Sequence, residues 1–121
     1  MFREYDVKML WADPSFYEPD VLTWSQKWRR RVERIPPTNH RMAPMAQQFL
    51  ADIVAKEIGH NGDSRLQRHV LNAVATESGS FRKEKKQSPR KIDLLACAVL
   101  ANGARHSVIG RAPKPRRAVV L

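Results

Sequence analysis

The sequence of 121 residues contains one cysteine, Cys97, and only five glycines. A single cysteine excludes an intrachain disulfide and a cysteine-based zinc site, and such sparse use is typical of a reducing cytosol. The glycines form no GxxxxGK[ST] phosphate-binding loop, so no ATP-binding site is predicted. The longest apolar run, residues 94–101, is too short to span a bilayer. The charged first residues lack an apolar segment, so no secretory signal is predicted.

Acidic residues are also scarce: 12 Asp and Glu stand against 22 Lys and Arg, which gives a net charge of +10. This excess in a short chain favours a polyanionic partner, with nucleic acid ahead of an anionic membrane surface. An inert, solvated basic surface is the alternative. The four histidines lack metal-ligand spacing and stand at positions 40, 60, 69 and 106.

Hydrophobic periodicity predicts one small α/β domain over residues 1–110, with a short sheet and about four helices. A strand over residues 5–12 ends at Asp13-Pro14, because proline cannot donate to a β-ladder. Short extended segments are expected at 32–35 and 80–87. The expected helices are 19–31, 42–57, 64–77 and 89–108. The basic, proline-containing tail 111–121 is expected to be disordered and to touch phosphates. The sheet looks too small to be complete.

Asp93 raises a specific question. Ser88 and Pro89 supply a good helix start, which would place Asp93 in the second turn of a helix that is apolar on every side. Such a helix is normally buried, and a buried charge is costly unless it is paired, hydrogen-bonded or bound to a metal ion.

A strand-end acid and a helix-start acid are a common basis for a hard-cation site, so Asp13 and Asp93 are the candidate metal ligands and catalytic residues. Basic residues would hold a DNA strand beside them: Lys83, Lys85, Lys86, Arg90 and Lys91. Simpler interpretations stay open. Asp13 can open an ordinary turn, Asp93 can pair with Arg90 or Lys91 or favour the helix dipole, and the basic stretch can be a solvated face.

Three segments together resemble a known family: "VKMLWADPSFYEPDV", "HNGDSRLQRHVLNAV" and "FRKEKKQSPRKIDLLACAVLA". They are similar to the C-terminal nuclease domain of the terminase large subunit of tailed bacteriophages. The shared pattern is a strand ending in an acid, an aromatic-rich helix, a histidine- and asparagine-bearing helix, and "I-D" opening an alanine-rich helix. The resemblance covers about residues 5–107.

The resemblance implies an RNase H-like fold that cuts double-stranded DNA during genome packaging, in the cytoplasm of the bacterial host. It implies two Mg²⁺ or Mn²⁺ ions, with Asp13 and Asp93 among their ligands, and Lys83 as a phosphate contact. Residues His60, His69 and Asn72 match a motif whose role is structural or DNA-proximal. The implied partners are the small terminase subunit and the portal.

The chain also departs from the family pattern. No ATPase motor is present, and the first nuclease strand, with its own metal-binding aspartate, would lie upstream of residue 1. Neither Glu4 nor Asp6 lies in an element that could replace that acid. We therefore expect an incomplete RNase H-like fold and a weak or inactive nuclease. The alternatives are a non-catalytic DNA-binding module and a piece that completes a separately encoded terminase half.

Overall fold

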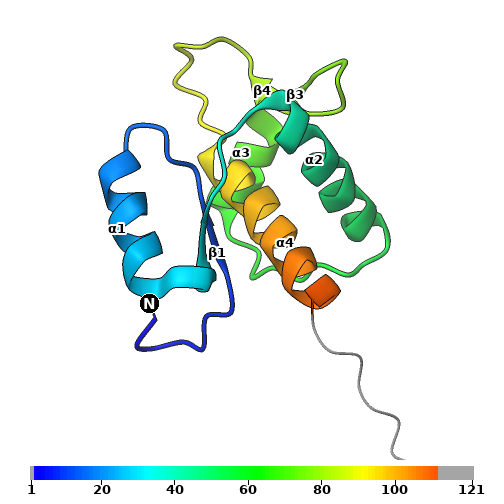
Figure 1. Cartoon of the computed structure of the whole chain (residues 1–121). Coiled ribbons are helices and arrows are strands. Elements are labelled where there is room, and N and C mark those ends of the chain that lie inside the picture. Colours follow the sequence, from blue (N-terminus) through cyan, green and yellow to red (C-terminus); the bar gives the residue numbers. More distant parts are fainter. Residues whose placement is uncertain (1, 112–121) are drawn as a thin grey trace, which may run out of the picture.

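The computed structural model describes residues 2–111, and the side chains of residues 2–109. The predicted tail therefore lies outside the described residues, apart from position 111. The elements run along the chain in the order β1 (Leu10–Ala12), α1 (Glu18–Trp28), the 3-10 helix η1 (Arg29–Arg31), β2 (Val32–Arg34), α2 (Asn39–Val54), α3 (Ser64–Asn72), β3 (Ala73–Ala75), β4 (Phe81–Lys83) and α4 (Asp93–Arg111). This confirms an α/β chain with four α-helices in its described part (Figure 1). No described helix combines the length and apolarity needed to cross a membrane.

The strands form two separate pairs instead of one short sheet. Strands β1 and β2 are parallel, with Leu10 opposite Val32 and Ala12 opposite Arg34, and α1 makes the crossover between them. Strands β3 and β4 form an antiparallel hairpin. The prediction of helix through position 77 was wrong, because the chain becomes extended at Ala73 and pairs with β4.

Helix α4 is the centre of the core, but it is buried on one face only. The buried apolar residues of α4 are Leu95, Val99, Leu100 and Ala104, and the polar Asn102 is buried too. Leu95, Val99 and Leu100 pack with Ile35, Met42 and partly buried side chains from β1, α2, β3 and β4. The predicted burial on every side was wrong: Leu94 and Cys97 are exposed, because the neighbouring elements cover only part of the helix.

The start of α4 also differs from the prediction. The helix begins at Asp93 instead of Pro89, and the Ser88 hydroxyl accepts a hydrogen bond from the Arg90 amide in the preceding loop. Asp93 is therefore the first helical residue and is exposed. The charge carries no burial penalty there, and the helix dipole favours an anion at this position.

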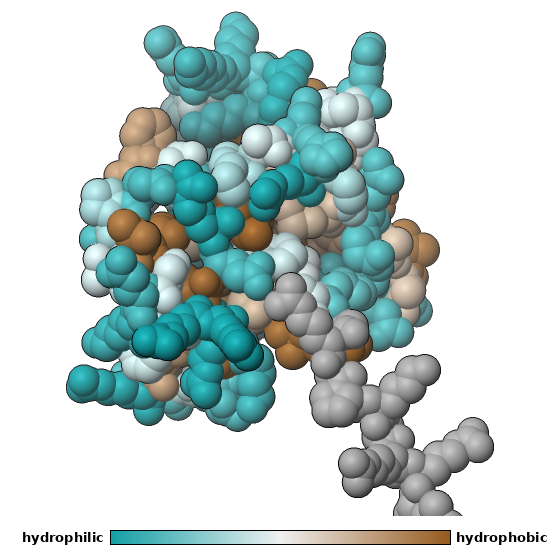
Figure 2. Space-filling view, in the orientation of Figure 1, coloured by the Kyte–Doolittle hydropathy of each residue, from teal (hydrophilic) through white to brown (hydrophobic). Residues whose placement is uncertain are grey.

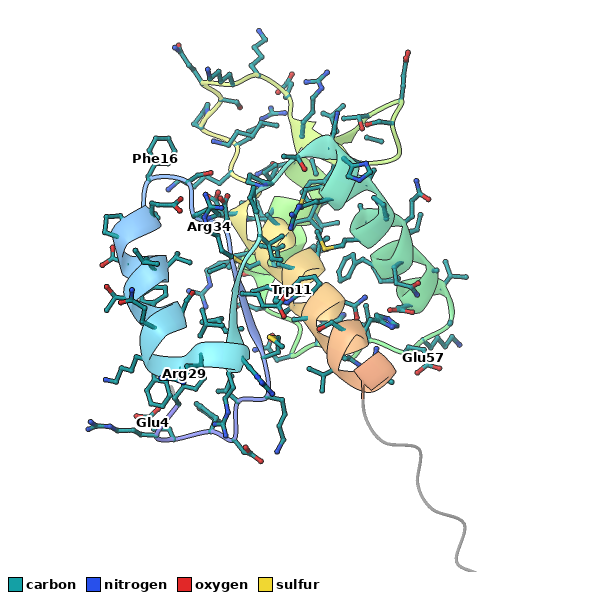
Figure 3. The ribbon with its side chains drawn as sticks, viewed as in Figure 1. Glu4, Trp11, Phe16, Arg29, Arg34 and Glu57 are labelled. Carbon is teal, nitrogen blue, oxygen red and sulfur yellow. The ribbon has the colours of Figure 1, made fainter. Side chains whose placement is uncertain are left out.

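The closest approach between β1 and α4 occurs at Gly103. A β-carbon at this position would lie 2.6 Å from Cζ3 of Trp11 and 2.9 Å from Sδ of Met45. Figure 3 shows Trp11 lying between β1 and α4. Only glycine leaves room for the indole ring, so this residue sets how closely strand and helix pack.

We predict that Gly103→Ala lowers the stability of the fold. Alanine would add up to about 1 kcal/mol of helix propensity. Overpacking against Trp11 and Met45 costs about 1–3 kcal/mol and should outweigh that gain. We expect a net loss of about 1 kcal/mol in urea unfolding. The control is Gly59→Ala, which has nothing within 4 Å and should be nearly neutral. Equal stability of the two variants would contradict the packing argument.

Candidate functional site

The two predicted acids line the same cavity, although they are far apart in the sequence. Asp13 follows β1 directly, and Asp93 opens α4. Both contribute to the wall of a cavity of about 950 Å³ between the β1 segment and α4. The wall also includes three aromatic side chains, Trp11, Phe16 and Tyr17. Both acids thus contribute to one largely apolar cavity, which extends along α4 from Asp93 to Ile109.

Asp13 is used locally in a turn. Its Oδ1 accepts a hydrogen bond of 2.8 Å from the Ser15 amide, and the Tyr17 amide donates to the Pro14 carbonyl at 3.0 Å. Asp13 therefore does open a turn, as the simpler interpretation predicts. The second carboxylate oxygen has no hydrogen-bond partner within residues 2–111. A turn that fixes one oxygen orients the carboxylate and leaves the other oxygen for a ligand.

The carboxylate of Asp93 forms no hydrogen bond or ion pair with another side chain or amide of the described residues. Arg90, one of its suggested partners, forms an ion pair with a different acid: its Nη1 is 3.6 Å from Oε2 of Glu84. Asp93 is therefore an exposed carboxylate at a helix N-terminus.

Helix α3 holds the backbone on both sides of Asp93. The Leu94 amide donates to Nδ1 of His69 at 2.9 Å, and Nδ2 of Asn72 donates to the Lys91 carbonyl at 3.0 Å. The first amides of a helix lack partners within the helix. His69 supplies one here, so its imidazole replaces the hydroxyl cap expected from Ser88.

His60 does not join this arrangement. Its Nδ1 accepts a hydrogen bond of 3.0 Å from the Gly62 amide in the turn before α3. It lines a separate groove of about 960 Å³ between α2, α3 and α4. His60, His69 and Asn72, which match one motif of the resembled family, therefore have different roles. Of these three, only His69 and Asn72 contact the backbone beside Asp93.

The five basic residues named from the sequence lie at the end of β4 and in the loop that leads to α4. All are exposed except Lys83, which is half-buried. The Arg82 guanidinium anchors the start of this loop, because it donates to the carbonyls of Lys83 at 2.8 Å and Glu84 at 2.9 Å. Figure 2 shows hydrophilic side chains gathered at this end of the molecule.

Only a small metal-ligand set is available. The described residues contain no group of three or more His, Cys, Asp or Glu side chains placed to hold a metal ion. Two carboxylates supply a minority of the six oxygens that Mg²⁺ requires, so waters and phosphate oxygens would have to complete the shell. A hard cation at Asp13 or Asp93 would therefore take most of its ligands from water and phosphate.

Sequence reasoning missed a buried carboxylate, Asp52 of α2. It accepts hydrogen bonds from Nε2 of His106 at 2.6 Å, Nδ2 of Asn102 at 2.7 Å and Nε2 of Gln48 at 2.9 Å. These bonds, with that from His106 the strongest influence, lower the pKa of Asp52 from 3.8 to about 2. The available signal was that Asp52 is the one acidic residue in the sequence of α2. Its partners in α4, Asn102 and His106, are distant in the sequence and could not be inferred from it.

We predict that His69→Ala weakens the start of α4. The Leu94 amide would lose its acceptor, and loss of an N-cap interaction costs about 1 kcal/mol. Hydrogen exchange at the Leu94 amide should accelerate, and the urea midpoint should fall. His40→Ala, at an exposed position in α2, is the matched control. Unchanged exchange at Leu94 would show that the imidazole does not cap the helix.

We also predict that the protonation of Asp52 contributes to the loss of folding stability at low pH. A lowered pKa in the folded state contributes stability that is complete above pH 3.8 and is lost as the pH falls through about 2. Asp52→Asn should lower the thermal midpoint at neutral pH and flatten its fall between these pH values. Asp20→Asn, at an exposed site in α1, should keep the steeper fall of the parent. A parent-like slope in Asp52→Asn would contradict this assignment.

Comparison with known proteins points to bacteriophages. Two proteins named Gene 13 protein, from Mycobacterium phages D29 and L5, are each 30% identical to the chain over 123 aligned positions. The alignments include 89% of this chain and 21% of each relative, so the chain spans about a fifth of the length of the curated relatives it matches. No protein-family model and no solved structure matches. The chain is therefore related to part of a larger bacteriophage protein.

Proposed function

We propose that this chain is the C-terminal part of a phage terminase large subunit, from the metal-dependent nuclease domain that cuts DNA during genome packaging. The observation that supports the proposal is that Asp13 and Asp93, which are far apart in the sequence, both line one cavity. The phage relatives, which are about five times longer than the aligned region, are consistent with a chain that corresponds to one part of a multidomain protein.

The proposed roles follow from the positions of the side chains. The carboxylates would hold Mg²⁺ or Mn²⁺, which when bound supply Lewis-acid stabilisation of a phosphodiester under attack. Asp13 is oriented by the Ser15 amide. The contacts of α3 with the backbone of Lys91 and Leu94 would position Asp93. The exposed bases before α4 would hold the DNA backbone next to the ions.

The proposal includes an incomplete site. In the resembled family a further metal-binding acid comes from another strand of the nuclease sheet, whereas within the described residues β1 pairs only with β2. Parallel sheets are normally larger and covered on both faces. A strand supplied by the remainder of a terminase would extend this sheet beside Asp13. We therefore propose weak or absent cleavage by this chain alone, in the cytoplasm of the bacterial host.

A non-catalytic DNA-binding module is the second candidate. The observation that favours it is that Asp13 already serves a turn, while Asp93 lies at a helix N-terminus where an acid is stabilising without any metal ion. On this view the bases alone would contact DNA.

We predict that Mg²⁺ or Mn²⁺ raises the thermal midpoint of the parent. At ten times the dissociation constant, a ligand that binds only the folded state adds about 1.4 kcal/mol, which is roughly 5 °C for a domain of this size. Asp93→Asn and Asp13→Asn should each abolish most of this shift. Asp20→Asn, in the first turn of α1, is the matched control and should keep the shift.

The outcomes separate the two candidates. A metal-induced shift that is lost in Asp93→Asn but kept in Asp20→Asn supports the nuclease site. The same metal response in Asp93→Asn and the parent would exclude this site. DNA binding that needs no metal ion and weakens steeply with salt would then support the DNA-binding module.

A further inference from the structure

A second basic surface lies away from the candidate site, at the end of α1. We call it the arginine cap and define it as Lys27, Arg29, Arg30 and Arg31. All four residues are exposed. Cations are expected at a helix C-terminus because of its dipole, but α1 ends at Trp28 and only Lys27 lies in its last turn. The three consecutive arginines of η1 therefore exceed what the helix end requires.

Within residues 2–111, no ion pair involves any member of the arginine cap. Asp6 is engaged by Lys8, whose Nζ lies 2.6 Å from Oδ2. The pKa of Asp6 is lowered mainly by that hydrogen bond and less by the charge of Arg31. Asp6, the acid on which the charge of Arg31 acts, is thus already paired with Lys8. The arginine cap therefore keeps its positive charge.

The arginine cap is also held in place. The rings of Phe2 and Trp28 stack with centroids 4.4 Å apart, and Nζ of Lys27 lies 5.3 Å from the Trp28 ring centroid. Arg29 has a backbone φ of 39°, in a region that residues other than glycine rarely adopt. Val32 directly follows the cap and is buried. The cations therefore project from a turn fixed on both sides, which reduces the ordering cost of binding.

The parallel pairing places the arginine cap opposite the acids. The cap precedes β2 and lies at the amino ends of the strands, whereas Asp13 follows β1 at their carboxyl ends. Figure 3 shows Arg29 at the opposite end of α1 from Phe16. The loop between β4 and α4 lies at the end of the molecule away from η1 (Figure 1). One short, straight DNA segment could not be expected to engage both surfaces.

We propose that the arginine cap is a second DNA-backbone site, separate from the bases before α4. Guanidinium groups pair with phosphate oxygens through two parallel hydrogen bonds, so three adjacent arginines fit a phosphate backbone better than they fit scattered carboxylates. This inference relies on the proposed function only in that DNA is the ligand. The chain then holds two duplex segments at once, or one long segment that passes around it.

The test is calorimetric titration with a duplex of about 12 base pairs, short enough to occupy one surface, at low salt. Chelator is present throughout, so the result does not depend on the metal site. The parent should bind two duplexes. Arg30→Gln/Arg31→Gln should bind one, at the bases before α4, and Lys85→Gln/Lys86→Gln should bind one, at the cap. The matched control, Lys56→Gln/Arg68→Gln, removes the same charge elsewhere and should still bind two.

Salt dependence gives a second readout on a longer duplex. Each lost phosphate contact reduces the slope of log K against log salt by about 0.9, so Arg30→Gln/Arg31→Gln should reduce it by roughly 2. Circular dichroism confirms that each variant is folded. The proposal is overturned if the cap variant matches the control in both stoichiometry and slope. It is also overturned if the variant loses binding only to anionic lipid vesicles or to an acidic protein.

Discussion

The packing of β1 against α4 at Gly103 is the constraint on which the candidate site depends. Asp13 follows β1 directly and Asp93 opens α4. The packing of β1 against α4 therefore decides where the two acids lie relative to each other. The indole of Trp11 fills the space left by the missing side chain of Gly103, and this contact sets the separation of strand and helix. Trp11 also lines the cavity to which both carboxylates contribute.

A second constraint acts at the start of α4. The helix is long and its buried face is central to the core, but its first turn receives no hydroxyl cap. Instead, His69 of α3 accepts a hydrogen bond from the Leu94 amide, and Asn72 of α3 donates one to the Lys91 carbonyl. The same two contacts stabilise the helix and fix the backbone on both sides of Asp93. Helix stability and site geometry are therefore coupled through His69 and Asn72.

The charge of the molecule is distributed in relation to the sheet. The bases before α4 lie near the candidate acids, while the arginine cap lies at the amino ends of the parallel strands. A crossover helix necessarily connects opposite ends of two parallel strands. Because η1 directly follows the crossover helix α1, the topology places the arginine cap and the bases before α4 at different ends of the molecule (Figure 1).

The four helices, an extended segment at β2, the end of the first strand before Asp13 and the identity of the basic loop could be predicted from periodicity and charge, because these features depend on residues close together in the chain. The first strand is shorter than predicted, since only Leu10–Ala12 of residues 5–12 are paired, and its parallel pairing with β2 was not predicted. The start of α4, the extended conformation at Ala73 and the buried Asp52 could not. Each depends on a partner from a distant element: the imidazole of His69, the β4 strand, and the polar groups of α4. A long-range hydrogen bond can override a local capping or helix signal, and only the tertiary structure shows where one is available.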